Sequence, residues 1–438
     1  MNDQMIAPGR ASDECSSVGE VPSTIMLWLC RLARHTVFSR LSQLQLGMVT
    51  IVEGHERFQF GRITSDCQLE ATLTIRDPRV YMDIMLEGTV GAGDAYRRAL
   101  WSCDDLTTLV RIAVRNRDLL DGMEGGLAML RTPLRRTLHW LNRNSKTGSR
   151  KNIAAHYDLG NDFFRLMLDD SMMYSCAYFE QPNATLAEAS RAKNDRICRK
   201  LQLVASDHLL EIGTGWGGFA IYAASHSGCR VTTTTISREQ YRLALHRVQE
   251  AGLGDRVTVL FTDYRDLPKL GVQFEKLVSI EMIEAVGHQY YDTFFETCSR
   301  MLKPQGLALI QGITIDERLY ERAKRSVDFI QRFIFPGSCI PSVSTLTQAS
   351  ANVGDLGLIH LEDIGAHYPP TLRAWGRNIV AKLPEIKALG YQPEFLRLWD
   401  FYLSYCEGGF LERSISTIHM LFAKPGFRSA RALHARDY

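Results

Sequence analysis

Leu209-Leu-Glu-Ile-Gly-Thr-Gly-Trp-Gly-Gly-Phe219 joins an apolar, strand-like run to the start of an amphipathic stretch. Its alternating glycines, Gly213, Gly215 and Gly217, let the backbone approach a ligand closely and adopt dihedral angles that side chains disfavour. A glycine loop between a strand and a helix is typical of nucleotide sites in doubly wound sheets. A tight turn without a ligand would also explain these glycines. The sequence on either side must therefore decide between such a turn and a nucleotide site.

Apolar runs alternate with amphipathic segments on both sides of this loop. We expect strands at residues 208–212, 230–235, 257–262, 276–280 and 307–313, with helices at 219–227, 238–251 and 290–302 between them. This βαβαβ order predicts an α/β fold with a doubly wound, mostly parallel sheet and helices on both faces. Ligands in such sheets bind beyond the carboxyl ends of the strands.

The residues around the loop favour a cationic ligand over a dinucleotide. The spacing is G-x-G-x-G, and Glu211, which precedes it, repels a pyrophosphate but attracts the amino and sulfonium groups of S-adenosylmethionine. The second expected strand ends in threonines, so Thr235 and Gln240 would bind the ribose. Asp263 and Tyr264, after the third strand, would bind and stack on the adenine. S-adenosylmethionine is therefore favoured over NAD, and the methyl acceptor stays open.

The composition is that of an ordinary soluble globular protein of 438 residues, with 45% hydrophobic and 23% charged residues. A formal net charge of +2 argues against a general nucleic-acid binder. The ten cysteines have no CxxC spacing, so we expect reduced thiols and no metal site. Residues 21–30 are apolar but too short to span a bilayer, and acidic residues precede them, so neither a membrane span nor a signal peptide is predicted.

A set of motifs downstream of residue 150 resembles those of the cyclopropane-fatty-acyl-phospholipid synthases. The motifs are His156-Tyr-Asp-Leu-Gly-Asn-Asp-Phe-Phe, Met173-Tyr-Ser-Cys-Ala-Tyr-Phe179, Glu211-Ile-Gly-Thr-Gly-Trp-Gly-Gly, Tyr264-Arg-Asp, Glu284-Ala-Val-Gly and Phe335-Pro-Gly-Ser-Cys-Ile-Pro-Ser. The resemblance covers about residues 150–425 and implies a class I, Rossmann-like methyltransferase. Such an enzyme uses S-adenosylmethionine to convert cis double bonds of phospholipid acyl chains into cyclopropane rings. The residues implied for the cofactor are Tyr174, Ser175, Glu211, Gly213, Gly215, Trp216, Gly217, Thr235, Ile236, Gln240, Asp263 and Tyr264.

The resemblance also implies a bound bicarbonate as catalytic base. An alkene must be held in line with the sulfonium methyl group in a dry pocket, and a base then removes a proton from the added methyl as the ring closes. The implied bicarbonate cage is made of Cys176, Glu284, Tyr368, the Ile313 backbone and Gln311. Gln311 stands where the family has histidine; it can donate an N–H to an anion but cannot relay a proton, which weakens the expectation.

Several other polar residues near these motifs are given no catalytic role. Glu281 is taken as a neighbour of Glu284 without a role, and His288 and His367 are not chosen as bases. His156 is expected to help position the site. The apolar residues 329–335 are either a core helix or, with Tyr178 and Phe179 opposite, the lining of an acyl-chain channel.

The chain divides into four expected regions. Residues 1–23 are polar and expected to be disordered. In residues 24–123, short runs of alternating apolar and polar residues predict a small N-terminal α+β domain. Residues 124–155 form a basic linker in which Lys and Arg surround Trp140, either merely solvated or facing anionic lipid head groups. Residues 156–430 form the methyltransferase domain, with a lipid-binding insertion at about 316–345.

These observations predict an enzyme that is cytoplasmic and peripheral to the inner face of an anionic membrane, with no nucleic-acid partner and with monomer or homodimer left open. Three alternatives remain. The same alkene methylation could give a methylene- or methyl-branched chain, since the deprotonation step decides the product. A small-molecule N- or C-methyltransferase would not need the basic segment or the insertion. A lipid-binding protein without catalysis would not need the cofactor loop.

Overall fold

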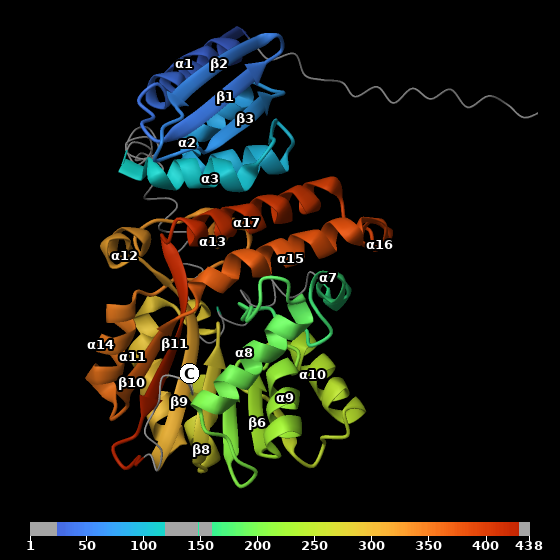
Figure 1. Ribbon diagram of the computed structural model, residues 1–438, viewed down its shortest axis with the longest axis vertical. Coiled ribbons are helices and arrows are strands. Elements are labelled where there is room, and N and C mark those ends of the chain that lie inside the picture. The colour runs from blue at the N-terminus through green and yellow to red at the C-terminus, as the bar shows by residue number, and fades with distance from the viewer. Residues whose placement is uncertain (1–23, 119–147, 149–159, 429–438) are drawn as a thin grey trace, which may run out of the picture.

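Residues 24–118, 148 and 160–428 are the part of the chain that the computed structural model describes. The larger of its two sheets has the strand order β10-β11-β9-β8-β5-β6-β7 (Figure 1). These strands are β5 (His208–Ile212), β6 (Arg230–Thr235), β7 (Val257–Phe261), β8 (Phe274–Ile280), β9 (Leu302–Ile315), β10 (Gly357–Asp363) and β11 (Ile415–Ala423). Pairing is parallel from β7 to β9 and antiparallel at β11 and β10. The predicted α/β fold with a mostly parallel sheet is confirmed, and an antiparallel pair extends one edge.

Helices cover both faces of this sheet because successive strand residues point to opposite sides. On β9, Leu307 and Leu309 pack with one helical layer, whereas Ala308 and Ile310 pack with the other. The first layer contains α8 (Leu186–Lys200), α9 (Gly218–Ser227) and α10 (Arg238–Glu250), and the second contains α11 (Tyr291–Met301) and α14 (Val343–Val353). Both strand faces are therefore buried, as in doubly wound sheets.

The N-terminal elements form a separate four-stranded sheet with the order β2-β1-β3-β4. Its elements are α1 (Thr24–Leu41), β1 (Gly47–Glu53), β2 (Glu56–Arg62), β3 (Glu70–Ile75), α2 (Arg79–Arg97), β4 (Trp101–Cys103) and α3 (Leu106–Arg115). The Asp105 carboxylate accepts from the Thr108 backbone N–H, which fixes the start of α3. Residues 1–23, most of the basic segment 124–155, and His156 lie outside the described residues.

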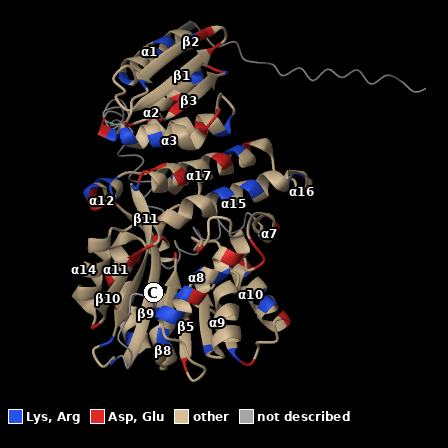
Figure 2. Cartoon of the chain, viewed as in Figure 1, with Lys and Arg blue, Asp and Glu red and all other residues tan. Residues whose placement is uncertain are grey.

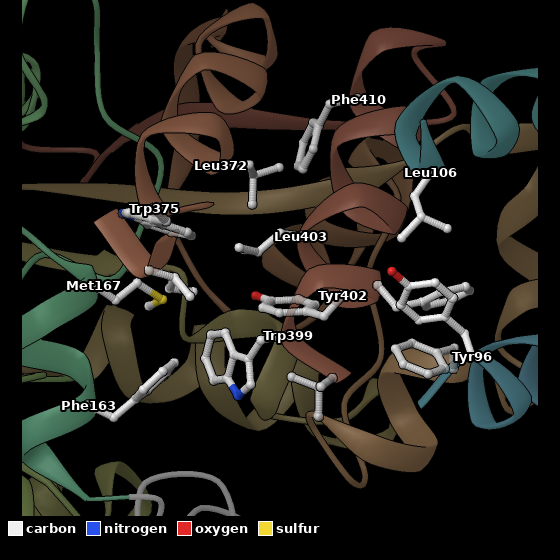
Figure 3. Close-up of a cluster of buried hydrophobic side chains, with 14 of the residues drawn as sticks. Tyr96, Leu106, Phe163, Met167, Leu372, Trp375, Trp399, Tyr402, Leu403 and Phe410 are labelled. Carbon is white, nitrogen blue, oxygen red and sulfur yellow. The ribbon is translucent and has the colours of Figure 1, made fainter. Parts of the chain in front are cut away.

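The helix α17 (Pro393–Leu411) lies between α15 (Tyr368–Ala381) and the N-terminal helices α2 and α3 (Figure 1). One hydrophobic core continues across it. Figure 3 shows Phe163 and Met167 from α7 (Asn161–Met167), Leu372 and Trp375 from α15, Trp399, Tyr402, Leu403 and Phe410 from α17, and Tyr96 and Leu106 from α2 and α3. Since each such side chain contributes about 1.5–3 kcal/mol when buried, this core holds the N-terminal sheet against the larger one.

Polar contacts add orientation to this hydrophobic interface. Glu412, directly after α17, accepts hydrogen bonds from Arg111 Nε and Arg115 Nε of α3, both at 2.7 Å. Tyr96 donates its hydroxyl to Asp400 at 2.5 Å. The two arginines hold the pKa of the Glu412 carboxyl below its ordinary value although burial opposes them.

We predict that Glu412→Ala lowers the free energy of unfolding by about 1–3 kcal/mol at pH 7, because two charged donors lose their acceptor. Stability from a carboxyl with a lowered pKa is complete above its ordinary pKa of 4.5 and is lost as the pH falls through the folded value. The difference between variant and wild type in thermal unfolding should therefore shrink in acid. Glu385→Ala, at an exposed pair with Lys382, is the matched control and should change little.

Candidate active site

A cavity of about 1170 Å³ opens at the carboxyl ends of β5, β6 and β8 and continues to the N-terminal sheet. It exceeds the roughly 300–1,000 Å³ of ordinary ligand pockets, so it has room for a nucleoside-sized ligand and a second, apolar one. Of the predicted cofactor residues, its wall includes Tyr174, Ser175, Glu211, Gly213, Gly215, Trp216, Thr235, Ile236, Gln240, Asp263 and Tyr264. The twelfth, Gly217, caps α9 and packs on Ala244 instead.

The glycine loop has the backbone that its sequence requires. Gly213, Gly215 and Gly217 all have positive φ angles, of +103°, +52° and +83°. A Cβ on Gly215 would meet nothing within 4 Å and would project into the cavity. The loop is therefore shaped around a space that a side chain would fill, which fits a ligand lying against the backbone.

Glu211 is a buried carboxyl that accepts a hydrogen bond from Thr233 Oγ1. Burial raises its pKa to about 8, although Thr233 and Lys193 oppose the shift. A cation placed in the adjoining cavity would favour the ionised form and would itself be stabilised. These residues fit the amino group of S-adenosylmethionine.

Three of the side chains expected to bind the ribose and adenine already make hydrogen bonds within the protein. Thr235 Oγ1 lies 2.9 Å from Gln240 Oε1, so the two residues reach the cavity as a bonded pair. Asp263 is engaged by Arg265, which donates from its backbone, Nε and Nη2. Tyr264, which packs edge-on against Phe294, is the available aromatic face.

Three of the five groups expected to surround a bicarbonate converge instead on the carboxylate of Glu281. Its Oε1 accepts from the Cys176 backbone N–H and from Gln311 Nε2, both at 2.9 Å. Its Oε2 accepts from the Tyr368 hydroxyl at 2.8 Å. Glu281, to which we assigned no role, is thus the residue that sequence reasoning missed. Its separation of three residues from Glu284 and the unusual Gln311 were the signals that could have found it.

Two of the expected cage residues, Cys176 and Ile313, take part through their backbone N–H groups. Cys176 is fully buried behind the cavity wall, and burial raises the pKa of its thiol well above the ordinary value, so its backbone N–H is the useful group. Ile313 donates its backbone N–H to Glu284 Oε1. The other oxygen of Glu284 is buried and has no hydrogen-bond partner among the described residues. Burial and then the proximity of Glu281 raise the pKa of Glu284 to about 8.

The apolar insertion contributes in part to the cavity. It contains α12 (Glu317–Ala323) and α13 (Phe329–Phe333), and Ile330 and Phe335 line the cavity while Phe329 is buried against Phe401. Tyr178 and Phe179 do not line it, contrary to our expectation. Tyr178 packs on His367, whose Nδ1 accepts from the Phe179 backbone N–H, so this pair belongs to a neighbouring contact.

The parallel sheet, the glycine loop at its carboxyl edge and the acidic residue before that loop define a class I S-adenosylmethionine-dependent methyltransferase. The chain belongs to the mycolic acid cyclopropane synthetase family, whose profile matches residues 144–420.

Relatives and solved structures agree with this assignment. The chain is 37% identical to the cyclopropane-fatty-acyl-phospholipid synthase of Escherichia coli over 82% of its length and 91% of that protein. It is 35% identical to the tuberculostearic acid methyltransferase UfaA1 of Mycobacterium tuberculosis, over 74% of its length and 76% of that protein. The structure of mycolic acid cyclopropane synthase CmaA1, complexed with SAH and CTAB, covers 63% of this chain and 98% of that one, at 31% identity and a TM-score of 0.57.

Substitution of Gly215 separates cofactor binding from backbone strain. Gly215→Ala should weaken the binding of S-adenosylhomocysteine about tenfold or more in calorimetry, because the new methyl group occupies the cavity. Gly271→Ala is the matched control: its φ is +68°, its Cβ would also meet nothing within 4 Å, and it is not part of the cavity wall. Both variants should lose about 1–2 kcal/mol of stability, and equal affinity in the two would contradict the assignment.

Proposed function

We propose that this enzyme transfers a methyl group from S-adenosylmethionine to the cis double bond of unsaturated phospholipid acyl chains and closes a cyclopropane ring. The observation that carries the proposal is the continuity of one cavity from the glycine loop to an apolar channel. A small polar acceptor would not need this second compartment. Family membership supports the same reaction class.

The channel beyond the glycine loop suits a hydrocarbon chain. Its wall is dominated by apolar and aromatic side chains from α15, α17, the start of β11 and the N-terminal domain, among them Leu73, Val80, Leu372, Phe401, Tyr402, Phe410 and Ile415. An acyl chain there would be held away from water, which a carbocation intermediate requires. The N-terminal domain thus supplies part of the substrate site.

A group of arginines lines the cavity beside α12. The group consists of Arg117, Arg318, Arg322 and Arg325, and Figure 2 shows the basic residues on this helix. Arg318 pairs with Asp316 and Arg325 with Glu321. Burial and then the neighbouring charge of Arg117 lower the pKa of Arg322, so these two guanidinium groups act on each other. We infer that this end receives the phosphate of the lipid, since guanidinium groups bind phosphate oxygens in a bidentate way.

We infer that the lipid is drawn from an anionic membrane surface at the cytoplasmic side. The helix α1 exposes Ile25, Trp28 and Leu32, an apolar group suited to an interface. Within the described ranges, no helix has both the length and the apolar character needed to cross a bilayer.

In the reaction, the chain's own residues hold, orient and shield the reactants. S-adenosylmethionine supplies an electrophilic methyl group when bound. Tyr174 lines the cavity with its ring 5.1 Å from Trp375 and 6.4 Å from Phe335, and aromatic faces of this kind stabilise a nearby cation. Bicarbonate does not fit this proposal, because three of the donors expected for it are bonded to Glu281 and the fourth, the Ile313 backbone N–H, is bonded to Glu284.

A methylene-branched product is the second candidate. It needs the same methyl transfer followed by a hydride shift before the proton is lost. Gln311, where the resembled enzymes have histidine, is the observation that favours it, because the difference lies at the deprotonation site.

The purified protein, mixed with labelled S-adenosylmethionine and vesicles of unsaturated anionic phospholipid, should incorporate label into acyl chains. Mass spectrometry of the fatty-acid methyl esters should find ring products; methylene branches would establish the second candidate instead. Vesicles of saturated phospholipid with the same head group are the control and should remain unlabelled. Absence of label from the unsaturated lipid would refute the proposal.

A further inference from the structure

We propose that the Glu281 carboxylate permanently occupies the anion site beside the methyl-transfer position and serves as the general base, so that the enzyme needs no bicarbonate. This inference rests on the proposed function for the identity of the carbon acid. Three donors that could surround a small oxyanion are all used by one side chain. Glu281 also lines the cavity, next to Tyr174, Glu284 and Ile313, and so faces the reacting chain.

The hydrogen bonds leave both oxygens of Glu281 fixed. Oε1 accepts from Cys176 N and Gln311 Nε2, and Oε2 accepts from Tyr368 Oη. Each carboxylate oxygen has two lone pairs, so Oε2 retains an acceptor position that a C–H proton can reach. The three hydrogen bonds stabilise the anionic form and lower the pKa of Glu281, but burial outweighs them and the pKa is raised overall.

The backbone conformation at Glu281 helps to place its carboxylate among the three donors. Its φ is +48°, in the left-handed region that residues other than glycine rarely adopt. Its N–H donates to the Gln311 carbonyl at 2.8 Å, at the point where β8 ends beside β9. Such a strained conformation persists where other contacts enforce it, and here it directs the carboxylate toward its three donors.

A buried polar chain orients Gln311 as a donor. His419 Nε2 lies 3.0 Å from Gln311 Oε1, and His419 Nδ1 lies 3.1 Å from Lys200 Nζ. Burial and then the charge of Lys200 lower the pKa of His419 far below its ordinary value, so the ring is neutral. With Nδ1 accepting from Lys200, Nε2 carries the proton and donates to the glutamine oxygen. The glutamine NH₂ group must then point at Glu281, which explains why glutamine suits this position.

The charged and titratable groups around Glu281 come from several elements. Lys193 on α8 is fully buried, donates to Ser175 Oγ at 3.0 Å and acts electrostatically on Glu281. Tyr368 on α15 and the Cys176 thiol have pKa values raised well above ordinary by burial, so both stay protonated. Burial also raises the pKa of Glu281, which strengthens it as a base, while Glu284, with a pKa of about 8, keeps its proton at pH 7.

The proton transfer balances with groups already present. Methyl transfer leaves a cation on the acyl chain, and a C–H bond of the added methyl breaks. Its electron pair forms the third bond of the ring, which cancels the positive charge. The proton moves to Glu281 Oε2, where a neutral carboxylic acid forms, and it leaves to solvent before the next turnover.

The test compares wild type with Glu281→Gln and Glu281→Gly in the vesicle assay, in carbonate-free buffer and with graded added bicarbonate. Wild type should be insensitive to bicarbonate, and its rate should rise with pH through the pKa of Glu281, above 4.5. Glu281→Gln should lose on the order of 10²–10⁴ in rate without rescue, because the amide still fills the site. Glu281→Gly, which suits the positive φ and empties the site, should lose as much and be rescued by bicarbonate.

Two further measurements keep the outcomes distinct. Binding of S-adenosylhomocysteine should be unchanged in both variants, which shows that the fold is intact, and exposed Glu385→Gln should match wild type in rate. Carbon-13 bicarbonate should bind to Glu281→Gly and not to wild type in NMR titrations. Stimulation of wild type by bicarbonate, or near-normal rate in Glu281→Gln, would overturn the inference while leaving the proposed function standing. Failure of wild type to label any lipid would instead refute the proposed function.

Discussion

A carboxylate buried beside an apolar cavity must be surrounded by donors, because an unpaired charge there would cost several kcal/mol. Glu281 obtains its donors from three separate segments of the chain. Cys176, Gln311 and Tyr368 lie 105, 30 and 87 residues from it in sequence. The site is assembled only when the loop before α8, the end of β9 and the start of α15 meet at the carboxyl edge of the sheet.

The exclusion of water from the reaction explains why the protein has two sheets joined by one core. A carbocation requires a channel from which water is excluded. The helix α17 packs against α15 on one side and against α2 and α3 on the other, and residues from both sheets line the cavity. The Glu412 contacts to Arg111 and Arg115 fix how these halves meet. Packing of the N-terminal elements against α17 is therefore part of forming the cavity.

Local sequence patterns predicted the elements of the larger sheet closely. The expected strands 208–212 and 230–235 match β5 and β6, and the expected helix 238–251 ends one residue beyond α10. Strand alternation and amphipathic spacing are local properties, so they can be read without tertiary information. The antiparallel strands β10 and β11 were not anticipated, since pairing partners far apart in sequence leave no comparable local signal.

By itself, the sequence determined the fold class, the glycine loop with Glu211 and the motifs that mark the family. These depend on residue type at fixed local spacing. Only the tertiary structure decided which carboxyl meets the donors of Cys176, Gln311 and Tyr368, because Glu281 and Glu284 are both acidic residues just after β8. Left-handed backbone at Glu281 and a glutamine oriented by His419 direct one of them to the donors. Tertiary packing likewise placed Tyr178 and Phe179 outside the channel, since His367 and not the substrate path is their neighbour.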